Sequence, residues 1–144
     1  MTLVARSAVG LRIFGDTLDP DLITGLLGCS PTFGRRKGST RTTSTGKVIT
    51  AKTGSWILDA ADREPADLDQ QIVEILGKLS QDLDIWRRIR EQFEIDIYVG
   101  LFMDESNEDF ELSQSTVAQL AARGISFGVS IYAPIEPESE AIPI

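Results

Sequence analysis

One helical stripe runs through residues 68–93, LDQQIVEILGKLSQDLDIWRRIREQF. Its apolar residues recur at three- and four-residue steps, which places them on one side of an α-helix. They are Leu68, Ile72, Ile75, Leu79, Leu83, Trp86, Ile89 and Phe93. A helix in a protein gains most of its stability by packing such a stripe against another surface. The sequence therefore predicts that this stretch forms a layer covering a sheet.

A single helix over this stretch is too long for the predicted sheet. It would measure about 39 Å at 1.5 Å per residue, whereas an eight-residue strand spans only about 27 Å. Gly77 and the polar group Ser80-Gln81-Asp82 mark the place where a break relieves this mismatch. We expect a helix capped by Asp67 that is interrupted between Gly77 and Asp82.

Three segments have the alternation of half-buried strands. They are residues 7–14, 94–103 and 125–132, where apolar residues alternate with small or polar ones. Two shorter strands are predicted at residues 47–51 and 55–60. The pattern predicts an α+β fold, a two-layer sandwich whose mostly antiparallel sheet has helices packed on one face.

Two further helices have clear end signals. The first is capped by Asp19, has Pro20 at its first position and ends at Gly28. The second is capped by Ser113 and ends at Gly124. Its inward-facing residues are predicted to be Val117, Leu120 and Ala121.

Length and composition favour one domain over residues 1–133. At 144 residues the chain can bury a sizeable core without a metal or disulfide, and its single cysteine, Cys29, leaves no internal disulfide. No apolar run reaches the roughly 18 residues of a membrane helix, and the first residues lack a secretory signal pattern. We expect a cytoplasmic protein that does not enter membranes, with a disordered acidic tail over residues 134–144.

The charges are distributed unevenly along the chain. Six of the 14 basic residues and none of the 22 acidic residues lie between Leu22 and Leu58, so the remainder carries a net charge of −14. Residues 34–46 are rich in hydroxyls, glycine and cations, which predicts a mobile basic loop. The acidic body repels phosphate, so we expect a basic protein partner rather than a nucleic acid.

No pattern in the chain is typical of an enzyme. It has no histidine. The glycines before Lys47 do not have the spacing that a phosphate-binding P-loop requires. Glu94 and Asp96 share one strand face, but two carboxylates without a third ligand are more typical of a solvated surface than of a metal site. We predict no catalytic residue, no metal and no cofactor.

Two groups of residues are candidates for binding. The first is an anion or small-molecule site that consists of Arg35, Arg36, Lys37, Arg41 and Trp56, although Trp56 suits the core at least as well. The second is the sheet face away from the helices, which combines strand glycines with aromatic rings. Its predicted interface residues are Gly10, Phe14, Tyr98, Gly100, Phe102, Gly128 and Tyr132. A homodimer, another partner or a segment of the chain itself could cover this face.

Short motifs in a fixed order resemble the bacterial domain-of-unknown-function family number 4279. They are Leu11-Arg-Ile-Phe-Gly-Asp, Asp19-Pro-Asp-Leu-Ile, Leu27-Gly with Pro31, Lys37-Gly, Thr53-Gly-Ser-Trp and the end from Leu120 to Tyr132. The resemblance covers about residues 9–132 and implies a small bacterial α+β domain. It implies no activity and no catalytic residues.

These observations favour binding over catalysis. The leading hypothesis is a non-enzymatic domain that docks a basic protein partner, as an immunity protein docks a toxin. The alternative is a small-molecule or anion sensor that uses the basic loop and Trp56. A basic polypeptide that copurifies with the protein would favour the first hypothesis, and a retained phosphorylated metabolite the second.

Overall fold

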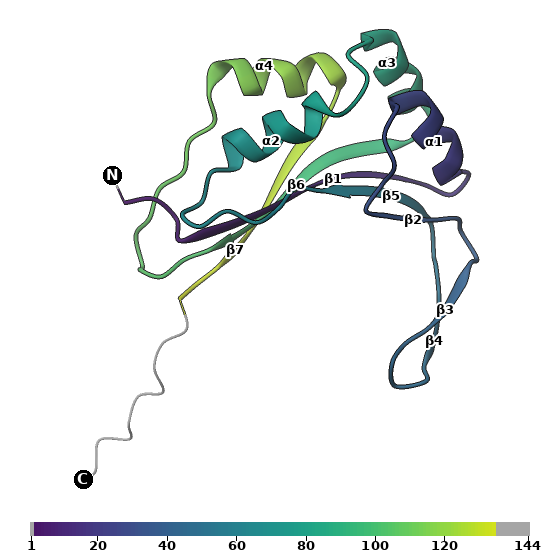
Figure 1. Ribbon diagram of the computed structural model, residues 1–144, viewed down its shortest axis with the longest axis horizontal. Helices are drawn as coiled ribbons and strands as arrows, with labels where there is room; N and C mark the ends of the chain where they lie inside the picture. Colours follow the sequence, from purple (N-terminus) through teal and green to yellow (C-terminus); the bar gives the residue numbers. More distant parts are fainter. Residues whose placement is uncertain (1, 135–144) are drawn as a thin grey trace.

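Four helices cover one face of an arched five-stranded sheet in the computed structural model, which describes residues 2–134 (Figure 1). The elements in chain order are β1 (Arg6–Gly15), α1 (Pro20–Leu27), β2 (Phe33–Arg35), β3 (Thr40–Thr42), β4 (Val48–Thr50), β5 (Gly54–Asp59), α2 (Leu68–Gly77), α3 (Leu83–Gln92), β6 (Glu94–Phe102), α4 (Gln114–Arg123) and β7 (Ser126–Tyr132). The predicted α+β fold is confirmed. The predicted tail lies, apart from Pro134, outside the described residues.

The sheet has the strand order β2-β5-β1-β6-β7. β1 is the central strand and pairs antiparallel with both β5 and β6. β7 is parallel to β6, and α4 makes the crossover between them, as a parallel pair requires. The sheet is therefore mostly antiparallel, with one parallel strand at its edge.

The core lies between the sheet and the helices. One face of β1 and β6 supplies alternating buried residues, and α2 and α3 supply the opposing stripe. The largest completely buried side chains are Trp56 and Trp86, both with 0% exposure. The predicted stripe over residues 68–93 is thus the cover of the sheet, except that Leu83 is 48% exposed.

The predicted break between α2 and α3 is confirmed. α2 ends at Gly77, and Asp82 caps α3 by accepting a 2.9 Å hydrogen bond from the backbone N–H of Asp84. Gln81 Nε2 donates to the backbone oxygens of Leu76 (2.9 Å) and Leu79 (2.8 Å). The side-chain amide therefore satisfies carbonyls that the end of a helix leaves without partners.

The basic segment is not the irregular loop that its composition predicts. β2 adds to the edge of the main sheet beside β5, and β3 pairs with β4 in a separate hairpin. This hairpin projects away from the helices (Figure 1). The prediction of a loop is therefore wrong for β2 and β3, whereas β4 lies within the strand predicted at residues 47–51, and the mobility of residues 34–46 stays a prediction.

One face of α4 was also predicted incorrectly. Leu120 is buried as expected, but Val117 is 50% exposed and Ala121 is also exposed. Thr116 and Arg123 are the other residues that α4 buries. The reason is that α4 lies at the rim of the helical layer, where one flank has no neighbour among the described residues.

Candidate functional site

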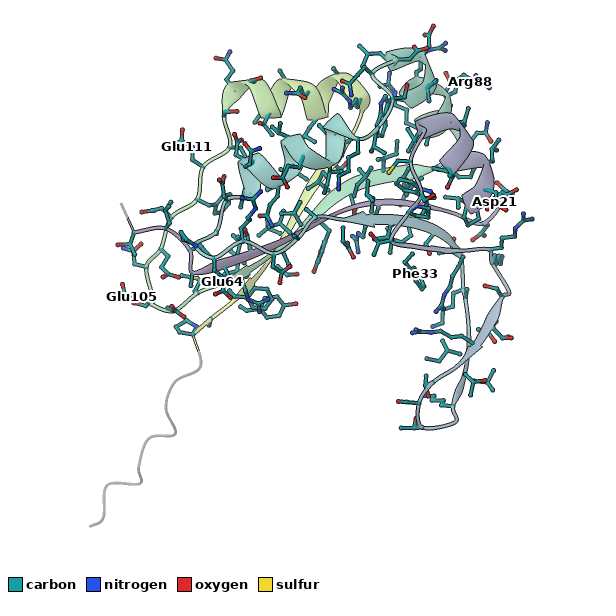
Figure 2. All side chains as sticks on the ribbon, in the orientation of Figure 1. Asp21, Phe33, Glu64, Arg88, Glu105 and Glu111 are labelled. Atoms are coloured by element: carbon teal, nitrogen blue, oxygen red, sulfur yellow. The ribbon has the colours of Figure 1, made fainter. Side chains whose placement is uncertain are left out.

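The sheet surface opposite the helices, here called the open face, carries all seven residues predicted as an interface. The strand register places Gly10 and Phe14 of β1 on this side, next to Tyr98 and its alternating neighbours in β6. β7 adds Gly128 beside Tyr98 and Tyr132 beside Phe102. The open face is concave, and Phe33 of β2 lies beneath the sheet on this side (Figure 2).

The glycines of the open face accommodate its own side chains. Gly10 and Gly128 are level with Tyr98 on either side, whereas Gly100 lies two residues further along β6. A Cβ atom at Gly10 would collide with the Asp59 carboxylate, and one at Gly100 would lie 3.3 Å from the Phe102 ring. Neighbouring side chains therefore fill the space at Gly10 and Gly100, whereas a Cβ atom at Gly128 would make only an ordinary contact, 3.7 Å from the Tyr98 ring. The interpretation that these glycines mark the approach of another chain stays a prediction.

Arginine and aromatic side chains stack on one another across this face. The rings of Phe102 and Tyr132 are parallel within 6°, with centroids 4.7 Å apart, and the Arg6 guanidinium lies 3.7 Å from the Phe102 centroid. Arg12 lies 4.2 Å from the Tyr98 centroid. Guanidinium groups favour such positions because the ring face is negative. The open face thus already binds two cations of its own chain.

Arg12 is held by a carboxylate as well as by the aromatic ring. It donates two hydrogen bonds to Asp96, at 2.9 and 2.7 Å. This two-point geometry is the strongest form of such a pair. The charge of Asp96 is therefore compensated by Arg12. Asp96 is not available to act with Glu94 in metal or acid–base chemistry.

A hollow of about 480 Å³ opens on this face between β5, β1 and β6. Small residues of β1 and β6, including Gly10 and Gly100, lie at its floor, and the aromatic rings of Tyr98, Phe102 and Tyr132 line one side. Asp59 and Asp62 line the other side. Arg12 also lines the hollow, which therefore combines aromatic rings with one cation and two carboxylates.

Asp59 carries the free charge of this hollow. Its carboxylate makes no ion pair or hydrogen bond with any residue of the described part of the chain, whereas Asp62 binds Arg6 at 2.7 Å. Burial raises the pKa of Asp59, and the charge of Asp62 raises it further. The fold holds this carboxylate in a position that disfavours its ionised form.

Asp59→Asn is expected to raise the free energy of unfolding at pH 7. Because the pKa of Asp59 is raised in the folded state, the wild type loses stability as the pH rises from the unfolded value, about 3.9, through the folded one. The asparagine variant lacks this loss, so the two proteins should converge in acid. Urea unfolding at several pH values measures the difference. A gain that is equal at pH 3 and pH 7 would contradict the assignment.

The cationic residues of the predicted anion site do not converge. Arg36 binds Asp19 at 2.9 Å and Lys37 binds Asp16 at 3.3 Å. Arg35 instead stacks on Phe33, with 4.5 Å between its guanidinium carbon and the ring centroid. Arg41 lies apart from them on β3, where it is exposed. Two of the four charges are thus occupied by carboxylates near the start of α1.

Trp56 does not belong to a ligand site. It is completely buried on the helix side of β5, opposite Ile13 of β1. Its Nε1–H donates a 3.1 Å hydrogen bond to Thr24 Oγ1 in α1. Of the two interpretations of Trp56, the core one is confirmed, and its assignment to the anion site is wrong.

Asp59 and Asp62 were not predicted as site residues. Asp59 is near the end of the strand predicted at residues 55–60 and Asp62 follows that strand, so both resemble an ordinary acidic connection. Only the pairing of Asp59 with Gly10 across two strands brings them to the aromatic rings. In the described residues no three histidine, cysteine or acidic side chains gather as metal ligands.

The family model described as domain of unknown function DUF4279 matches residues 5–134, so the chain belongs to this family. A search of the curated proteins found no match, and a search of the solved structures found none either. Among residues 2–134, no helix has the length and apolarity needed to cross a membrane.

Proposed function

We propose that this chain is a bacterial protein-binding domain that docks a basic partner on its open face. The observation that carries the proposal is the unpaired Asp59 carboxylate in a hollow lined by Tyr98, Phe102 and Tyr132. A carboxylate beside aromatic ring faces suits a guanidinium or ammonium group, which gains a charge-assisted hydrogen bond and a cation–π contact. An arginine side chain of the partner is the best fit.

The rest of the face supports the same partner chemistry. Arg6 on Phe102 and Arg12 on Tyr98 use the same combination of ring and carboxylate within the chain. The formal net charge of −8 attracts a basic protein at long range and accelerates its association. A carboxylate whose ionised form is disfavoured is also more typical of a functional site than of an ordinary solvated surface.

A peptide titration tests this proposal. The probe is the capped peptide Gly-Ser-Arg-Ser-Gly, and its control carries citrulline, which has the shape of arginine without the charge. We expect the backbone amide signals of Gly10, Asp59 and Gly100 to shift in nuclear magnetic resonance spectra. A charge-assisted hydrogen bond contributes about 1.5–3 kcal/mol, so the arginine peptide should bind at least about tenfold more tightly than its control.

Two variants make the result specific to the hollow. Asp59→Asn should reduce the affinity for the arginine peptide to about that for the citrulline peptide. Asp21→Asn removes the same charge from exposed α1 on the other side of the sheet, and it should leave the affinity within about twofold, because only weak long-range attraction changes. Equal binding of both peptides, or equal weakening by both variants, would contradict a cation site at Asp59.

A further inference from the structure

The last helix and strand form an uncharged surface on a highly charged chain. A quarter of all residues are charged, but residues 112–135 contain only one charged side chain, Arg123, and this residue is 5% exposed. The accessible surface of α4 and β7 is therefore free of charge. Charged residues are depleted at the core of protein–protein interfaces.

β7 is an edge strand without the usual protection. No described residue pairs with its outer side, because β7 is the last strand in the sheet order. Its seven residues, SFGVSIY, contain no lysine, proline or other residue that discourages pairing with another strand. The opposite edge differs, since β2 has only three residues and includes Arg35. The unpaired backbone groups of β7 are thus available to a further strand.

Apolar side chains extend this edge into the helical layer. Phe127 is 36% exposed and Ile131 is 62% exposed on the side of β7 that faces α4. Arg123 reaches inward to Gln81, in the connection between α2 and α3, at 2.9 Å. Val117 and Ala121 lie about 120° and 160° around the helix axis from Arg123, at 100° per residue. They therefore point away from α2 and are exposed.

We propose that a second copy of this chain pairs with this edge, antiparallel through β7. A twofold axis at Val129 would then place Val129 beside its own copy, Phe127 opposite Ile131, and Gly128 opposite Ser130. At the five central residues large apolar side chains meet large ones and small residues meet small ones, while Ser126 is opposite Tyr132 at the two ends. Two five-stranded sheets thereby become one continuous sheet, flanked by the exposed sides of both α4 helices.

The charges restrict where a second copy can bind. Two molecules that each carry a net charge of −8 repel one another over most of their surfaces, and only a contact free of charge avoids this cost at close range. The uncharged surface coincides with this edge, and antiparallel pairing about a twofold axis gives a closed dimer. The paired strands would be about 24 Å long.

The association state tests this interface. We expect the wild type to sediment as a monomer–dimer mixture between about 10 and about 500 µM, the range of affinity of a small interface. Ile131→Lys should be monomeric throughout, because it places a charge opposite Phe127 of the other copy. Val48→Lys, at an equally exposed position (61%) on the hairpin, should associate as the wild type does. A wild type that stays monomeric at about 500 µM, or an associating Ile131→Lys variant, would overturn the proposal.

A cysteine crosslink tests the register independently of any loss of folding. In a Cys29→Ser background, Val129→Cys places two thiols on the axis, where paired Cα atoms are about 4.5–5.5 Å apart and within reach of a disulfide. Ser126→Cys is the control, since its copies would be about 20 Å apart along the strands. Oxidation with glutathione disulfide should give a covalent dimer of the first variant alone. Absence of that dimer, or equal crosslinking of both variants, would refute the twofold at Val129.

Discussion

Trp86→Ala is expected to lower the free energy of unfolding by about 3–5 kcal/mol, the range of large aromatic residues removed from a core. The side chain is completely buried in α3, and its Nε1–H donates a 2.7 Å hydrogen bond to the backbone oxygen of Ser80. The variant therefore loses apolar burial and leaves a buried carbonyl in the α2–α3 connection without its partner. Domains of this size have a free energy of unfolding of only about 5–15 kcal/mol. The substitution therefore removes a large part of the stability of the wild type.

Urea unfolding of Trp86→Ala measures this cost, and the same helix supplies a control. Leu83 is part of the same sequence stripe but is 48% exposed, so Leu83→Ala should cost less than about 1 kcal/mol. If the two variants lose similar stability, α3 does not pack as described.

Gln71→Leu is expected to cost about 3 kcal/mol, although leucine is apolar and similar in size. Gln71 has no exposed surface, and its Nε2 donates to the backbone oxygens of Ser7 (3.0 Å) and Ala61 (2.9 Å). Its Oε1 accepts a hydrogen bond of 2.5 Å from Ser7 Oγ. Each buried polar group that loses its partner costs about 1–3 kcal/mol, which outweighs the gain from the added apolar surface.

Gln70→Leu is the matched control for this variant. Gln70 is the exposed neighbour of Gln71 in α2, so the same substitution should change the free energy of unfolding by no more than about 0.5 kcal/mol. Chemical denaturation compares the two variants. An equal effect at both positions would mean that Gln71 does not join β1 to the connection before α2.

The parts of the fold that the sequence predicts correctly have local causes. The caps at Asp19, Asp67 and Ser113 and the break before Asp82 each depend on residues within one helical turn. The strands β1 and β6 can be predicted because one face is buried and the other is not, which makes apolar and polar residues alternate. Such signals survive in the sequence because each local preference agrees with the final structure.

β3 lacks such a signal. All three of its residues are exposed. With no buried face there is no alternation to detect, because backbone hydrogen bonds rather than apolar packing define this strand. Composition alone therefore predicted a loop there, whereas its partner β4 lies within the strand predicted at residues 47–51.

The candidate site could be predicted only in part for a different reason. The aromatic residues of the open face follow from the alternation of β6 and β7, but the position of Asp59 depends on the register between β5 and β1. Gly10 and Asp59 are far apart in sequence, and no local pattern specifies which residues of two strands become neighbours. The exposed flank of α4 was missed because an amphipathic pattern does not show whether a helix lies in the middle or at the rim of its layer.

The central place of β1 in the sheet has a consequence for synthesis on the ribosome. Gly10 of β1 pairs with Tyr98, which is synthesised 88 residues later. At ordinary translation rates this delay is roughly 4–18 s. The other neighbour of β1 is β5, which emerges earlier, so one edge of β1 lacks its final partner for most of the synthesis, and contacts between such distant residues form slowly in any case. An unpaired strand edge is prone to aggregation, so this edge is where a chaperone that shields the early part of a chain would protect it.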